Sequence, residues 1–205
     1  MLHLRVHPDN PQPRLISQAV ERIRAGDVIV YPTDAAYAIG CQIGNKAAME
    51  RIAQIRGLSP KHQYAILCCD LSDLATYAKV DNATYRLLKN NTPAVTTFIL
   101  NATSEVPRRL MHAKRKTIGL RIPSNPICQQ LLQELGEPLL TSTLILPHQE
   151  DPLDDPYDIE MQLGKRIDVL IDGGLGTLNT TSIVDLSGDQ PVIVRHGVGD
   201  ISAFE

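Results

Sequence analysis

Apolar residues along the chain follow two spacings, one typical of helices and one typical of strands. Residues 14–24 carry apolar side chains at positions 15, 16, 19, 20 and 23, which is one face of a helix, and the helix is expected to stop at Gly26. Residues 28–31 form a β-branched apolar run, as in a buried strand. Because segments of both kinds alternate through the chain, the pattern predicts an α/β fold.

The same spacings predict the remaining elements. Further helices are expected at 46–56, 71–79, 82–90, 125–135 and 157–164, the first of them capped by Asn45. Further strands are expected at 64–69, 95–100, 117–122, 139–146, 167–171, 182–186 and 192–195. No internal repeat and no long linker divides the sequence, so one domain over residues 1–205 is predicted.

The strand at 28–31 ends in an unusual way. YPTDAAYAIGC (31–41) stops at Pro32 and then presents Thr33, Asp34 and Tyr37 among alanines. Polar groups set among such small residues indicate that something lies close against the backbone there. A strand end that is simply capped by Thr33 and Asp34 is the structural alternative.

Composition places the chain among ordinary globular proteins. Hydrophobic residues make up 43% and charged residues 21%. No apolar run approaches the roughly 20 residues of a membrane span, and the first residues have no apolar signal segment. The four cysteines show no CxxC spacing and are expected to be reduced thiols, mostly buried. We therefore expect a cytoplasmic protein without a membrane partner.

The charges are unevenly distributed. Residues 108–121 hold six Lys or Arg and no acid, and residues 150–160 hold six acids and no Lys or Arg. The basic segment is a candidate site for phosphate, nucleotide or RNA, with a solvated face as the alternative. The candidate RNA-binding residues are Arg108, Arg109, Lys114, Arg115 and Lys116.

Known catalytic and cofactor motifs are missing. The chain has no GxGxxG, no P-loop, no HExxH and no GxSxG, and the GGLG at 173–176 is expected to be a turn. The sequence therefore predicts no built-in cofactor and no protein-bound metal, and it identifies no catalytic residue. Mg²⁺ is expected only as the companion of a bound nucleotide.

Four stretches together resemble the YrdC-like superfamily of threonylcarbamoyl-AMP synthases. They are YPTDAAYAIGC, KTIGLRIPSNP (116–126), TTSIVDL (180–186) and VIVRHGVG (192–199). RIAQIRGLSP and NNTPAVTTFIL resemble the YciO branch more closely. The resemblance implies a three-layer α/β fold, with a twisted mixed sheet flanked by helices and a large positively charged cleft. It also implies a link to threonylcarbamoyl-adenosine of tRNA and to double-stranded RNA binding.

The resemblance also assigns ligand contacts residue by residue. It places a threonine contact at Thr33 and the family tyrosine at Tyr37. Family arginines that face phosphates fall on Arg121 and Arg195. The other implied contacts are Arg56, Thr143, Thr181 and Ser182. A solvated strand end is the alternative for Arg121, and an ion pair with Asp185 or Asp200 is the alternative for Arg195.

Two positions depart from the synthase pattern. Leu58 stands where the synthases have arginine, and Ile145 where they have asparagine. Losing two hydrogen bonds to charged groups, each worth about 1.5–3 kcal/mol, predicts poor synthesis of threonylcarbamoyl-AMP from ATP, threonine and bicarbonate.

Three hypotheses follow from these substitutions. The first is an RNA-binding protein that reads or hydrolytically removes the threonylcarbamoyl group of tRNA, with Asp34 the nearest acidic residue for a general base. The second is a synthase, which would be a nucleotidyltransferase, and the third is a nucleotide or RNA sensor without catalysis. The expected partners are tRNA or double-stranded RNA, and an adenine nucleotide or threonylcarbamoyl-adenosine.

Overall fold

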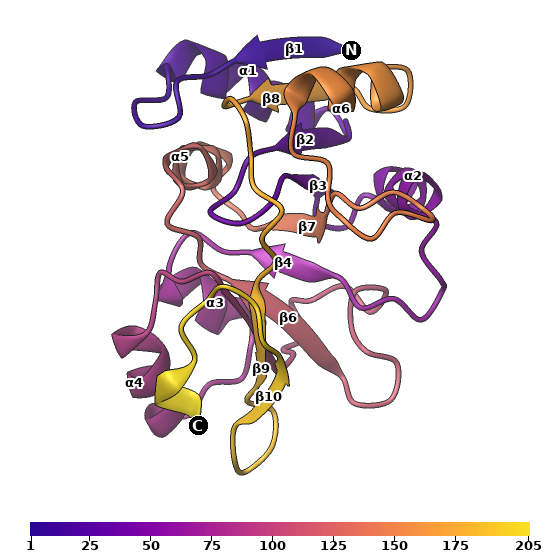
Figure 1. The fold of residues 1–205 in the computed structure, drawn as a ribbon. Helices are drawn as coiled ribbons and strands as arrows, with labels where there is room; N and C mark the ends of the chain where they lie inside the picture. The colour runs from indigo at the N-terminus through magenta and orange to yellow at the C-terminus, as the bar shows by residue number, and fades with distance from the viewer.

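One twisted sheet of ten strands runs through the molecule, and the computed structural model describes all of residues 1–205 (Figure 1). The strands lie in the order β1-β8-β2-β3-β7-β4-β6-β5-β9-β10. Four neighbouring pairs are parallel and five are antiparallel. The strands are Leu2–Arg5 (β1), Ile29–Tyr31 (β2), Ala38–Gln42 (β3), Ala65–Leu67 (β4), Thr96–Asn101 (β5), Thr117–Arg121 (β6), Leu139–Thr143 (β7), Val169–Asp172 (β8), Ser182–Asp185 (β9) and Val192–Arg195 (β10).

Six α-helices connect these strands, and their ends carry the signals expected from the sequence. The helices are Pro13–Arg24 (α1), Lys46–Arg56 (α2), Leu71–Tyr77 (α3), Asn82–Asn90 (α4), Pro126–Leu135 (α5) and Pro156–Leu163 (α6), with a short 3₁₀ turn at Ser202–Phe204. The predicted cap at Asn45 is confirmed, because its side chain accepts from the backbone N–H of Ala48 at 3.0 Å. Helix α2 ends at Gly57 with a left-handed φ of 63°.

Helices cover both faces of the sheet, so the predicted three-layer α/β fold is confirmed. On one face, α1 and α5 pack on buried residues such as Ile29, Leu139 and Val169. On the other face, α2, α3, α4 and α6 enclose a larger core that includes Phe98 and Leu120. The two clusters hold 18 and 32 buried residues, so most of the apolar stabilisation lies on the second side.

The α1–α5 face changes character along the sheet. Strands β7, β4 and β6 place Thr141, Ala65 and Gly119 side by side in register. The next residues along two of these strands, Ile66 and Leu120, point to the opposite face and join its core. Because side chains alternate within each strand, these strands present small side chains on one face of the sheet and large apolar ones in the core on the other. Thr141, Ala65 and Gly119 form the floor of the candidate site.

Two strands of the sheet were not predicted. β1 is an edge strand of four residues that gains its order from parallel pairing with β8. β3, with the sequence AIGCQ, contains Ala and Gly, which have low strand propensity. It forms because β2 and β7 pair with it on both sides.

The approach of β7 to β3 depends on Gly40. A Cβ atom there would lie 2.4 Å from the backbone oxygen of Leu140 and 3.1 Å from Tyr31 Cε1. We expect Gly40→Ala to lower the free energy of unfolding by about 1–3 kcal/mol, because overpacking forces these neighbours apart. Urea denaturation measures this change. Gly188→Ala is the matched control, since nothing lies within 4 Å of its added Cβ, and equal stability of both variants would contradict the expectation.

Candidate functional site

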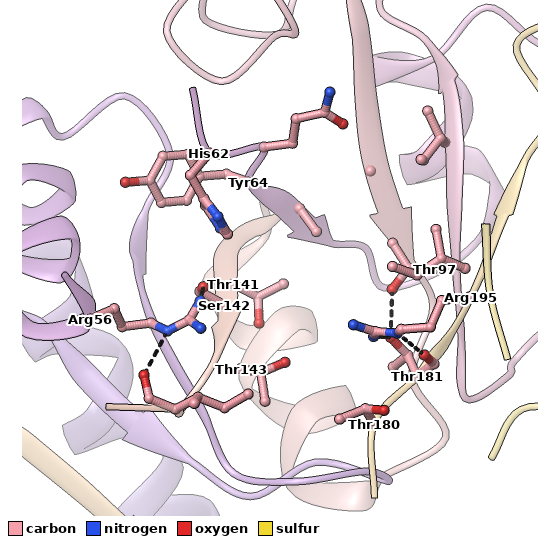
Figure 2. Close-up of a pocket in the computed structure, with 16 residues that line it drawn as sticks. Arg56, His62, Tyr64, Thr97, Thr141, Ser142, Thr143, Thr180, Thr181 and Arg195 are labelled. Carbon is pink, nitrogen blue, oxygen red and sulfur yellow. Dashed lines mark hydrogen bonds between the residues drawn. The ribbon is translucent and has the colours of Figure 1, made fainter. Parts of the chain in front are cut away.

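A pocket of about 230 Å³ lies over the floor of small side chains (Figure 2). Its residues come from the end of α2, the segments before β4 and before β9, the segment after β7, and strands β4, β5, β6, β7, β9 and β10. They are Arg56, His62, Gln63, Tyr64, Ala65, Thr97, Ile99, Gly119, Thr141, Ser142, Thr143, Ile145, Thr180, Thr181, Ile183 and Arg195. The pocket thus collects residues that lie up to 139 positions apart in the sequence, from Arg56 to Arg195.

Arg56 forms one wall of the pocket, as the last residue of α2. Its Nε donates to the backbone oxygen of Ile145 at 3.2 Å, and its Nη1 donates to the hydroxyl of Ser142. Both partners are neutral, so the positive charge of this half-buried side chain has no carboxylate counterion. Burial lowers the pKa of Arg56 from its usual value.

Arg195 lies on the opposite side of the pocket, at its exposed edge (Figure 2). Its Nε donates to the backbone oxygen of Thr181 at 2.9 Å, and its Nη2 donates to the Thr181 hydroxyl at 3.0 Å. Thr97 approaches the same hydroxyl at 3.2 Å. The alternative of an ion pair with Asp185 or Asp200 is wrong, because these carboxylates bond elsewhere and Arg195 holds only neutral groups.

The pocket carries positive charge and hydroxyl groups but no acid. Two arginines and seven hydroxyl side chains are among its 16 residues, and no Asp or Glu is. An arginine without a counterion retains donors for a phosphate or carboxylate group. The arrangement therefore favours an anionic ligand that spans the space between Arg56 and Arg195.

His62 and Tyr64 border the pocket on the side of β4. Their rings meet edge to face, with centroids 5.1 Å apart and planes at 83°. Burial, together with the nearby charge of Arg56, lowers the pKa of His62. Burial raises the pKa of Tyr64. At neutral pH both rings are therefore uncharged.

Four of the predicted ligand residues meet in this pocket. They are Arg56, Thr143, Thr181 and Arg195. Ile145 also lines it, whereas Leu58 does not. Ser182 is buried beside it, where its hydroxyl donates to Gly199 O at 2.7 Å and accepts from Gly197 N–H at 3.0 Å.

Thr33 and Tyr37 lie outside the pocket, beneath the connection from β8 to β9. Thr33 Oγ1 donates to the backbone oxygen of Ala36 at 2.7 Å. The Tyr37 hydroxyl donates to Gly174 O at 2.7 Å, and its fully buried ring packs against Gly176, where a Cβ would lie only 2.7 Å from the ring. The backbone that approaches the small residues of this segment is therefore the protein's own 173–181 connection.

Arg121 also lies outside the pocket, at the end of β6. Its Nη2 forms an ion pair with Asp34 Oδ1, and the two side chains are only 7% and 9% exposed. The other carboxylate oxygen of Asp34 accepts from the backbone N–H of Ser124 at 3.0 Å and from its hydroxyl at 3.2 Å. The alternative of a solvated strand end is therefore wrong for Arg121. Asp34 is likewise committed to structural contacts and does not reach the pocket.

The basic candidates lie on the loop between β5 and β6, and their side chains are exposed. They are Arg108, Arg109, Lys114, Arg115 and Lys116. The side chain of Arg115 is held within the protein, because it forms an ion pair with Asp185 and donates to the Ser187 hydroxyl at 2.8 Å. Arg109 borders a surface hollow with Lys46 and Glu50 of α2.

Several pocket residues were not found from the sequence. Thr97 and Thr141 each occupy the small or polar position of an alternating strand. The alternation of apolar and polar residues in these strands is visible in the sequence. Whether the polar side chains line a pocket depends on which strands become neighbours in the sheet. His62 and Ser142 carried no local signal, since one lies in an irregular segment and the other enters the pocket where β7 ends.

Other features bear on the expected classes of protein. No group of three His, Cys, Asp or Glu is placed to hold a metal ion. All four cysteines are free thiols, three of them buried. None of the helices combines the length and the apolar character that crossing a bilayer demands.

Comparisons of sequence identify relatives over most of the chain. Residues 21–197 match the family Sua5_yciO_yrdC, described as "Telomere recombination". The chain is 56% identical over 199 residues to YciO of Escherichia coli (strain K12), with 97% of each chain covered. It is 30% identical over 159 residues to the threonylcarbamoyl-AMP synthase of Nitrosococcus oceani, with 77% of this chain and 85% of that protein covered.

Solved structures show the same fold. The crystal structure of E. coli YciO superposes with a TM-score of 0.95 at 54% identity, covering 100% of both chains. P. abyssi Sua5, in its structure complexed with L-threonine, superposes with a TM-score of 0.87 over 96% of this chain and 58% of its own. At 22% identity this second likeness shows the fold alone.

The buried pair of Arg121 and Asp34 predicts a strong effect on stability. We expect Asp34→Asn or Arg121→Met to lower the free energy of unfolding by about 3–5 kcal/mol each, because either change leaves a buried polar partner uncompensated. The double variant should lose less than the sum of the two single losses. Urea denaturation of the three variants measures these energies, and two small additive losses would show that the pair is not coupled.

Proposed function

The chain belongs to the Sua5/YciO/YrdC family, and on this basis we propose that it binds threonylcarbamoyl-adenosine of tRNA between Arg56 and Arg195 and removes the threonylcarbamoyl group by hydrolysis. In an alternative form of this proposal, the pocket binds the modified nucleoside of tRNA without hydrolysing it. The observation that carries it is the pair of arginines without counterions that face each other across an acid-free pocket.

The chemistry of the ligand suits this arrangement. Threonylcarbamoyl-adenosine within tRNA offers a threonine carboxylate at one end and backbone phosphates at the other, and each can accept two hydrogen bonds from a guanidinium group. The hydroxyls of Thr97, Thr141 and Thr143 between the arginines can bond to the carbamoyl and ribose groups. The relatives named threonylcarbamoyl-AMP synthase, and the L-threonine in the P. abyssi Sua5 structure, support a ligand of this class.

The direction of the reaction follows from what the pocket lacks. Synthesis has to bind the triphosphate of ATP, which needs hydrogen-bond donors. Ile145 places an apolar side chain in the pocket where the synthases have asparagine, and the side chain of Leu58, where they have arginine, does not line the pocket at all. Hydrolysis of an existing threonylcarbamoyl group needs only that group, its nucleoside and water. The substitutions therefore favour removal over synthesis.

Synthesis of threonylcarbamoyl-AMP is the second candidate function. The observation in its favour is the retention of a cation at Arg56, two residues before Leu58, and of a hydroxyl at Thr143, two residues before Ile145. The comparison with the Nitrosococcus oceani synthase points the same way.

A paired assay distinguishes the two reactions. Purified protein is incubated with ATP, threonine, bicarbonate and Mg²⁺, or with tRNA that carries threonylcarbamoyladenosine, and the products are read by mass spectrometry. We expect the modification to be lost from tRNA, with no threonylcarbamoyl-AMP formed. Formation of threonylcarbamoyl-AMP would favour the synthase, and tRNA bound without any product would leave a reader.

Binding should depend on both walls of the pocket. We expect Arg56→Met and Arg195→Met each to weaken binding of an anticodon stem-loop that carries threonylcarbamoyladenosine by about 10- to 100-fold, because each removes hydrogen bonds from a charged donor. Isothermal titration calorimetry measures the affinity. Arg86→Met on the exposed surface of α4 is the matched control and should bind normally, and normal binding by both pocket variants would exclude this site.

The basic loop supplies the proposed contact with RNA. Arg108 and Lys114 are exposed and make no ion pair, so they are free to meet phosphates. We expect Arg108→Glu with Lys114→Glu to weaken tRNA binding and to reduce the slope of log affinity against log salt by about 1.8, or 0.9 per phosphate contact. Filter binding across a salt series measures both quantities.

The control for the RNA experiment reverses two exposed cations elsewhere. Lys79→Glu with Arg86→Glu changes net charge by the same amount on a different surface. If both double variants lose affinity equally, the loop contributes only through net charge and the proposed RNA contact is wrong.

A further inference from the structure

The hydrolysis proposed above requires a group that accepts a proton from water, and the pocket restricts which group this can be. Four of its 16 residues have ionisable side chains: Arg56, His62, Tyr64 and Arg195. Arginines stay protonated at physiological pH and cannot act as bases. Burial raises the pKa of Tyr64, so its hydroxyl also keeps its proton.

His62 combines the right position with an uncommitted ring. Figure 2 shows its imidazole directed toward the interior of the pocket, on the side of Arg56. The edge-to-face contact with Tyr64 fixes the plane of the ring. No protein group hydrogen-bonds to either ring nitrogen of His62, whereas both ring nitrogens of His3 and the Nδ1 atoms of His7 and His112 bond within the protein.

We propose that His62 is the general base of this pocket, which activates water for attack on the threonylcarbamoyl group. The inference rests on the proposed hydrolytic function. It replaces Asp34, the acid suggested by the sequence, because that carboxylate is held by Arg121 and Ser124 away from the pocket.

The reaction is balanced with water as its only co-reactant. Water transfers a proton to the free nitrogen of His62 as its oxygen bonds to the carbamoyl carbon. Arg56, on the same side of the pocket, supplies positive charge for the developing oxyanion. The bond from the carbonyl carbon to N6 of adenosine then breaks, and N6 takes the proton from the imidazolium. The released N-carboxythreonine loses CO₂ and leaves threonine.

The charged surroundings of His62 fix the expected pH dependence. Arg56 faces it from α2, Tyr64 faces it from its own segment, Arg195 lies across the pocket and Lys61 precedes it in the chain; no carboxylate lines the site. A base acts only when neutral, and burial together with Arg56 lowers the pKa of His62. The rate should therefore rise with pH to a plateau that is reached below the pH expected for free imidazole, whose pKa is about 6.5.

The test uses the full-length protein and an anticodon stem-loop that carries threonylcarbamoyladenosine. We expect His62→Gln to reduce the release of threonine by about 10²-fold or more, to abolish the acidic limb of the pH profile, and to bind the stem-loop within about threefold of wild type. His148→Gln, on an exposed loop outside the pocket, is the matched control and should hydrolyse normally. His62→Ala should regain part of its activity when imidazole is added, which a purely structural role would not produce.

The outcomes separate the two proposals. If wild type hydrolyses the stem-loop and His62→Gln retains both its rate and its pH profile, the role of His62 is wrong while the proposed function stands. If wild type binds the stem-loop but releases no threonine at any pH, the hydrolytic function fails and the role of His62 fails with it. Thermal denaturation of both variants shows whether a loss of activity reflects loss of folding.

Discussion

The alternation of side chains across strands β4 to β7 is the constraint on which the site depends. Each strand must put large apolar residues into the core on one face. Because successive side chains point to opposite faces, the residues between them must lie on the other face. Because β7, β4 and β6 pair in register, Thr141, Ala65 and Gly119 become neighbours. The floor of the pocket is thus a direct consequence of the pairing that builds the core.

The two arginines gain their chemistry from their neutral surroundings. Arg56 and Arg195 donate to backbone oxygens and hydroxyls, which hold the guanidinium groups in place without neutralising their charge. Arg121, in contrast, is paired with Asp34 at the end of β6. Three arginines of similar appearance in the sequence therefore lie in different surroundings: two line the pocket proposed to bind an anion, and one is held in a buried structural pair.

The small residues of the segment YPTDAAYA accommodate the protein's own backbone and not a ligand. Its small residues do accommodate a backbone at close range, as the sequence indicated. The backbone is that of the 173–181 connection, which hydrogen-bonds to Ala36 and Tyr37 and packs Gly176 on the tyrosine ring. This connection crosses the sheet from β8 to β9 (Figure 1). The small residues of YPTDAAYA therefore determine where the 173–181 segment crosses.

The sequence by itself determined the helices, most of the strands and the α/β class, because these follow from local periodicity and from helix-end signals such as the cap at Asn45 and the stop at Gly26. It also singled out Arg56, Thr143, Thr181 and Arg195, which the fold brings into one pocket. Only the tertiary structure decided that β3 is a strand, that Arg121 is paired with Asp34, and that His62 joins the site. Each of these depends on partners distant in sequence, and no local pattern records which strands and loops become neighbours.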